Sequence, residues 1–100
     1  ILNAGYFSYQ AHKLGTIEEQ DFQRAFNVNV IAPVLLVQTL QNNLLAGQEK
    51  KVVAISSRRG SISMTQEEKY EGRYGYRCSK TALNAAMSAL SIDRSEITTL

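Results

Sequence analysis

A short, unbroken apolar run restricts the fold of this chain most: residues 52–55, Val-Val-Ala-Ile. Such a run is typical of a strand that is covered on both faces, as in a parallel sheet. It lies between two stretches of helical periodicity, residues 17–46 and 76–92, and residues 1–2 and 97–100 are further strand candidates. The order strand, helix, strand, helix, strand predicts an α/β fold with right-handed crossovers and a parallel sheet that has helices packed on its faces. A doubly wound sheet has about six strands, and this chain supplies at most three, so it is expected to be part of such a sheet.

Local signals predict the limits of the first helix. Thr16 is followed three residues later by Glu19, the pattern of a capping box at a helix N-terminus. Gly47 is placed to end the helix. Pro33, the only proline, lacks an N–H donor and should bend or interrupt the helix near Asn29.

Composition narrows the possible functions. The 100 residues fit one domain or part of one, and a net charge of +2 is too small to favour a nucleic-acid or membrane partner. With one cysteine, Cys78, and one histidine, His12, neither an internal disulfide nor a cysteine or multi-histidine metal site is predicted. No apolar run approaches the ~18 residues of a membrane span, and no signal-peptide pattern is present. The single cysteine suits a reducing compartment, and a cytoplasmic location is expected.

The chemistry-bearing pair with the most suggestive spacing is Tyr76 and Lys80. Four positions apart in a helix, they share one face and can approach each other. A phenol ionises near pH ~10, and a neighbouring ammonium stabilises the phenolate, so that the phenol can exchange a proton with a carbonyl oxygen as hydride reaches the carbon. Taken alone, such a pair is usually part of a solvated helix face.

Two other polar residues stand at informative places. Ser57 closes the apolar strand, where its hydroxyl could hold a substrate oxygen or simply satisfy turn backbone groups. Asn29 interrupts an apolar helical stretch, and a buried amide must be paired. It could hold a water against Lys80 in a proton relay, or satisfy carbonyls freed by the bend at Pro33. Residues 58–74 are polar and predict a loop.

Together these elements resemble the short-chain dehydrogenase/reductase family along nearly the whole chain. The matching stretches are Asn3-Ala4-Gly5 after a strand, Val28-Asn29-Val30 in a long helix, Ile55-Ser56-Ser57 at a strand end, and Tyr76-x-x-x-Lys80 opening a helix. The stretches 60–62 and 74–84 look most like the subgroup of C-factor and sniffer-type carbonyl reductases. The resemblance implies that residues 1–100 are the central portion of one NAD(P)-binding Rossmann-type domain, a three-layer α/β/α sandwich.

The resemblance also implies roles. Tyr76 would be the acid/base, Lys80 would bind the nicotinamide ribose and promote ionisation of the phenol, Ser57 would orient the carbonyl, and Asn29 would hold the relay water. The cofactor, NADP or NAD, would contact Asn3, Ala4, Gly5, Tyr76 and Lys80. Members commonly form homodimers or homotetramers through the two long helices.

The expected activity is NAD(P)(H)-dependent reduction of a carbonyl or oxidation of a secondary alcohol. The family's glycine-rich phosphate turn and the residue that selects NAD or NADP have no counterpart in these residues, so they are expected upstream and the 100 residues alone are expected to be inactive. Two alternatives stay open. One is a C-factor-like binding or signalling protein with little turnover, and the other is an isomerase or dehydratase that shares the Tyr-x-x-x-Lys core.

Overall fold

Three strand segments run parallel in the computed structural model, which describes residues 1–7 and 12–100. The central one, β1 (Lys51–Val52), pairs in parallel with β2 (Thr98–Thr99), and beyond its end Ala54 forms a parallel bridge with Leu2. Backbone bonds join the segments, from Leu2 N to Val53 O at 2.7 Å on one side and from Leu100 N to Val52 O at 2.8 Å on the other. The predicted parallel arrangement is confirmed, although regular pairing is shorter than the apolar runs.

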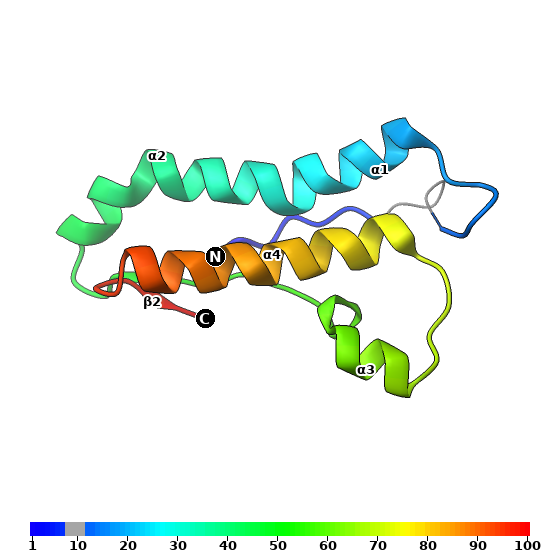
Figure 1. The fold of residues 1–100 in the computed structure, drawn as a ribbon. Helices are drawn as coiled ribbons and strands as arrows, with labels where there is room; N and C mark the ends of the chain where they lie inside the picture. Colours follow the sequence, from blue (N-terminus) through cyan, green and yellow to red (C-terminus); the bar gives the residue numbers. More distant parts are fainter. Residues whose placement is uncertain (8–11) are drawn as a thin grey trace.

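Two long helical stretches cover these strands (Figure 1). The first consists of α1 (Glu19–Phe26), a π-helical turn η2 (Asn27–Ile31) and α2 (Ala32–Ala46), and the second is α4 (Tyr74–Asp93). Both α1 and η2 pack against α4, so the two stretches lie side by side on one side of the strands. Between helices and strands lies the apolar core, formed by Val37, Val52 and Ile97 with Leu2, Leu44, Leu45, Met87 and Leu90 around them.

The prediction that Pro33 bends or interrupts the helix near Asn29 is confirmed as an interruption, because the π-helical turn η2 separates α1 from α2. The N–H of Ala32 bonds to the carbonyl of Asn27, five residues back, and Pro33 stands at the start of α2 without a donor of its own. A π turn of this kind widens the helix locally and is frequent at functional sites.

The predicted capping box is wrong. The helix begins at Glu19, its N-cap is Glu18, and no side chain caps it. Thr16 lies before this start and belongs to a turn, in which its hydroxyl donates to the Lys13 carbonyl at 3.0 Å and its N–H bonds to the same oxygen at 3.1 Å.

The prediction of a loop over residues 58–74 is also wrong in part. It contains the 3₁₀ turn η3 (Arg58–Gly60) and the short helix α3 (Ile62–Glu67), whose N-cap Ser61 accepts the Met64 N–H at 3.3 Å. Local capping by Ser57 and Ser61 explains how such a polar segment becomes helical.

Gly60 lets η3 approach α4 closely. A Cβ on Gly60 would lie 2.8 Å from Asn84 Nδ2 and 3.1 Å from the main-chain carbonyl of Lys80. The Thr81 hydroxyl donates to the Gly60 carbonyl at 2.9 Å across the same contact. This contact fixes the segment after the central strand against the helix that carries Tyr76 and Lys80.

The continuous helix Glu19–Ala46 is long and apolar enough to cross a membrane by length and composition. One such helix is weak evidence, because core helices of water-soluble domains pass the same test. Its buried Asn29 bonds to Tyr6 and Ser79, as expected of a helix that packs on other elements of a domain.

Candidate active site

The predicted site residues gather where the strands end. Because Leu2 and Ala54 are bridged in parallel, Asn3-Ala4-Gly5 and Ser56-Ser57 leave the sheet at the same carboxyl edge. In open α/β sheets this edge is where ligands bind. The first turns of α4, with Tyr76 and Lys80, complete the group.

Asn29 is the most firmly held of these residues, with 1% of its surface exposed. Its Oδ1 accepts the Tyr6 N–H at 2.8 Å, and its Nδ2 donates to the Tyr6 carbonyl at 2.9 Å and to Ser79 Oγ at 2.9 Å. The amide therefore joins the segment that follows the first strand, at Tyr6, to α4, at Ser79. Its side chain does not satisfy helix carbonyls freed by Pro33.

Ser79 links this amide to Tyr76. It is fully buried, accepts from Asn29 Nδ2, and donates to the Tyr76 carbonyl at 2.8 Å. Reasoning from the sequence missed it, although one signal was present. Ser79 stands four residues before Leu83 on the same helix face, and a serine at such a core position must find a partner.

Lys80 is an ammonium placed inside the domain, with 4% of its surface exposed. Its Nζ donates to the Ile55 carbonyl at 2.9 Å and lies 5.7 Å from the centre of the Tyr76 ring. Burial lowers the pKa of this ammonium from its ordinary value of 10.5, because desolvation disfavours the charged form. Among the described residues, one acceptor for its three N–H donors is found, which leaves donors for a ligand or water.

Gly5 lies close to both the Asn29 amide and the Lys80 ammonium. A Cβ on Gly5 would be 3.9 Å from both Asn29 Oδ1 and Lys80 Nζ, which is an ordinary contact. Its backbone is not left-handed, so the turn does not require glycine for its backbone angles. Glycine instead keeps the space in front of Lys80 open, and the neighbouring Asn3 and Ala4 are exposed at the sheet edge.

The two hydroxyl-bearing site residues differ in how they are held. Tyr76 is half-buried, with its ring 5.2 Å from that of Phe7. Ser57 is the N-cap of η3, where its Oγ accepts the Arg59 N–H at 3.1 Å. That bond is the turn-satisfying role considered above, and it leaves the hydroxyl proton available to a substrate oxygen. Ser56 donates its proton to Asn84 Oδ1 at 2.6 Å.

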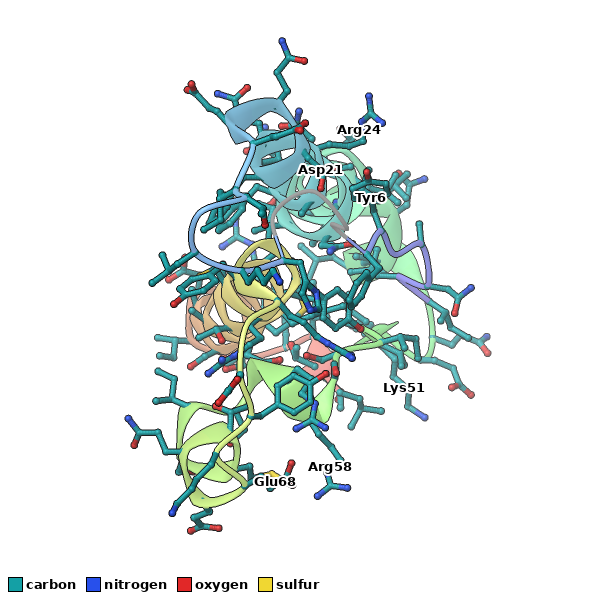
Figure 2. All side chains as sticks on the ribbon, turned by 90° about the vertical axis from the view of Figure 1, so that its right-hand side faces the viewer. Tyr6, Asp21, Arg24, Lys51, Arg58 and Glu68 are labelled. Atoms are coloured by element: carbon teal, nitrogen blue, oxygen red, sulfur yellow. The ribbon has the colours of Figure 1, made fainter. Side chains whose placement is uncertain are left out.

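A further clamp holds Tyr6, the residue whose backbone Asn29 grips. Its phenol donates to the buried carboxylate of Asp21 on α1, and the Arg24 guanidinium lies 5.7 Å from its ring (Figure 2). The hydrogen bond to Asp21 is the main cause that raises the pKa of Tyr6 above its ordinary 10.0. Tyr6 is thus held by hydrogen bonds of both its main chain and its side chain.

The model of the short chain dehydrogenase family matches residues 1–97. The chain belongs to the short-chain dehydrogenase family. Among curated relatives, it is 32% identical over 80 residues to C-signal of Myxococcus xanthus, covering 80% of this chain and 46% of that protein. It is 36% identical over 78 residues to L-xylo-3-hexulose reductase of Hypocrea jecorina, covering 75% of this chain and 26% of that protein.

Solved structures of carbonyl reductases have a similar fold. The NADPH-bound carbonyl reductase from chicken fatty liver superposes with a TM-score of 0.81 at 31% identity, covering 99% of this chain and 41% of that one. Carbonyl reductase Sniffer of D. melanogaster gives a TM-score of 0.76 at 28% identity, covering 94% and 41%. The predicted α/β fold class is confirmed. This short-chain dehydrogenase chain spans less than half the length of each of these proteins.

Proposed function

We propose that the protein is an NAD(P)H-dependent oxidoreductase that reduces a carbonyl compound, or oxidises a secondary alcohol, with Tyr76 as acid/base. One observation carries the proposal most. The buried Lys80 ammonium lies one helical turn from Tyr76 and faces the space that Gly5 leaves open at the carboxyl edge of the strands. A buried lysine with its pKa lowered by desolvation, placed beside a phenol at a sheet edge, is a candidate functional site on physical grounds.

NADP(H) or NAD(H) is the cofactor that family membership and the NADPH-bound neighbour support. The residues present fit a dinucleotide. Asn3, Ala4 and Gly5 offer an exposed edge without bulky side chains, and Lys80 retains N–H donors suited to ribose hydroxyls. When bound, the nicotinamide would supply or accept the hydride.

The chain's own residues would handle the proton. During reduction Tyr76 would give its phenolic proton to the substrate oxygen, while the Lys80 ammonium stabilises the phenolate that remains. The Ser57 hydroxyl would donate to the same oxygen and hold it in place, since its bond to Arg59 uses only the oxygen as acceptor. Oxidation of an alcohol would reverse these steps.

Asn29 would support the proton relay through its main chain. Its amide is occupied by Tyr6 and Ser79, so the side chain is a poor choice for holding a water. Its carbonyl has no α-helical partner, because the residue four positions on is Pro33, which has no N–H. We therefore assign the water-binding acceptor to the Asn29 carbonyl, with the amide fixing its position.

A test uses the full-length protein and follows NADPH and NADH oxidation at 340 nm with a panel of aldehydes and ketones. Tyr76→Phe should lower kcat/KM by at least about 100-fold, the usual contribution of a general acid. Tyr74→Phe, on the same helix, is the matched control and should retain activity. Activity of the Tyr76→Phe protein within a few-fold of the wild type would overturn the assignment.

A second candidate function is favoured by the similarity to C-signal. In this alternative the protein keeps the fold and the cofactor site but signals or binds with little turnover. Tight NADPH binding by calorimetry, with no carbonyl in the panel reduced, would support it.

Further properties of the whole protein follow as proposals. We infer that residues 1–100 form the central part of a single dinucleotide-binding domain, inactive alone, in a cytoplasmic protein. A groove of about 630 Å³ between α2 and α4, lined by residues that include Val34, Met87 and Leu90, supports association of copies through these helices. Sedimentation velocity of the full-length protein would show a dimer or tetramer if this is correct, and a monomer if it is not.

A further inference from the structure

The net charge of the chain is concentrated in the segment between the central strand and α4. Residues 58–77 carry five basic and three acidic side chains, and the other 80 residues carry six of each. The sequence offered no basic patch, because these residues are spread over twenty positions. Folding brings two of them, Arg59 and Arg73, to one tyrosine ring.

That ring is Tyr70, which two guanidinium groups contact. The central carbon of Arg59 is 3.2 Å from its centroid, and that of Arg73 is 4.8 Å from it. Arg73 also lies 5.2 Å from the centroid of Phe7, and the Phe7 ring is 5.2 Å from that of Tyr76. A continuous chain of contacts thus leads from Tyr76 to the Arg73 guanidinium.

Arg73 differs from its basic neighbours in how its charge is used. Glu68 forms ion pairs with both Arg58 and Arg59, at 2.6 and 2.5 Å, and Figure 2 shows Arg58 and Glu68 together on this part of the molecule. Arg77 donates to the Tyr70 and Gly72 carbonyls and to Thr65 Oγ1. For the Arg73 guanidinium, neither a carboxylate nor a hydrogen-bond acceptor is found among the described residues, and ring contacts do not use up its N–H donors.

The backbone holds Arg73 in a defined place despite strain. Its φ of 57° and ψ of 42° are left-handed, which a residue with a side chain rarely adopts. Its N–H donates to the His12 carbonyl, and the Gly72 before it is also left-handed, with φ of 68°. Strained residues that the surroundings hold firmly cluster at ligand-binding sites.

We propose that Arg73 binds a carboxylate on the substrate, so that the protein acts on oxo compounds that carry an acid group at a distance from the carbonyl. Guanidinium groups bind carboxylates through paired N–H donors. The Phe7 ring between Arg73 and Tyr76 would pack against a flat or apolar substrate body. The inference rests on the proposed function, since it takes Tyr76 as the place of the carbonyl.

The test compares two probes that differ by one charge, 4-carboxybenzaldehyde and its methyl ester, in NADPH-linked reduction by the full-length protein. The wild type should favour the acid by about tenfold in kcat/KM, as expected for a hydrogen bond to a charged group. Arg73→Gln should remove this preference while leaving reduction of the ester and the dissociation constant of NADPH within about twofold. Added salt should weaken the preference in the wild type.

Arg94→Gln is the matched control, because Arg94 lies at the far end of α4 and bonds to Gln41. It should keep the preference. Equal kcat/KM for acid and ester in the wild type, or a preference for the acid that survives in Arg73→Gln, would overturn the carboxylate site. In either case, reduction of the ester would still support the proposed function. If neither aldehyde is reduced, calorimetry of 4-(hydroxymethyl)benzoate decides. Binding that is lost in Arg73→Gln supports the anion site, and equal binding by both proteins overturns it.

Discussion

Replacing Ser79 by alanine tests the connection between the two long helices. Ser79 Oγ is the acceptor for one N–H of the buried Asn29 amide, and both residues are almost fully excluded from solvent. Alanine would leave that N–H unpaired, at a cost of about 1–3 kcal/mol. It would also remove the bond from Ser79 to the Tyr76 carbonyl three residues back.

Ser91 provides a matched control on the same helix. Its hydroxyl makes the same kind of bond, to the Ser88 carbonyl at 2.6 Å, but it is exposed, and among the described residues no hydrogen bond joins it to another helix. The difference between Ser79→Ala and Ser91→Ala therefore isolates the contact with Asn29. We expect a difference of about 2 kcal/mol in the free energy of unfolding, or about 4–8 °C in Tm for a domain of 150–250 residues.

The assay is urea unfolding of the full-length protein followed by circular dichroism, with kcat measured on the same preparations. Ser79→Ala should also lower kcat, because the Asn29 carbonyl loses its support, whereas Ser91→Ala should leave kcat unchanged. A difference between the two variants below about 0.5 kcal/mol, the range of ordinary surface substitutions, would refute the reasoning.

Three further predictions concern packing and charge. Gly60→Ala should destabilise the protein by about 1–3 kcal/mol, because its Cβ would lie 3.1 Å from main-chain atoms of α4. Gly47→Ala is the control: the atoms nearest to its Cβ would be 3.4 Å away, so the free energy of unfolding should change little in the same denaturant assay. Lys80→Met should abolish turnover yet raise or preserve Tm at pH 7. The lowered pKa of Lys80 means that its buried charge destabilises the folded state, an effect that fades as the pH rises towards 10.5. A clear drop in the Tm of Lys80→Met would contradict this. The raised pKa of Tyr6 means that its protonated phenol stabilises the folded state below pH 10, and this stabilisation is lost as the pH rises through the pKa of Tyr6 in the folded protein. The free energy of unfolding of Tyr6→Phe should therefore depend less on alkaline pH than that of the wild type.

Periodicity and residue spacing predicted the order of elements, because helices and buried strands have different repeats and Pro33 marks the interruption of the helix near Asn29. The partners of Asn29 could not be predicted in the same way. Tyr6 is 23 residues before it and Ser79 is 50 residues after it, and neither spacing has a local signature. Such pairs become visible only when the parallel strands bring the two crossover helices together.

The segment of residues 58–74 was harder to predict for a different reason. Its composition is polar, so apolar periodicity gave no helical signal, yet caps at Ser57 and Ser61 and the close approach at Gly60 organise it against α4. These are tertiary contacts, which a single helical repeat does not encode.

The central claim is that Tyr76 supplies the proton during carbonyl reduction. The most direct measurement is the rate of hydride transfer in a single turnover, with NADPH absorbance followed after rapid mixing of the full-length enzyme–NADPH complex with the aldehyde. We predict that Tyr76→Phe binds NADPH with a similar dissociation constant but transfers hydride at least about 100-fold more slowly. A transfer rate within a few-fold of the wild type, at unchanged NADPH affinity, would contradict the role of Tyr76.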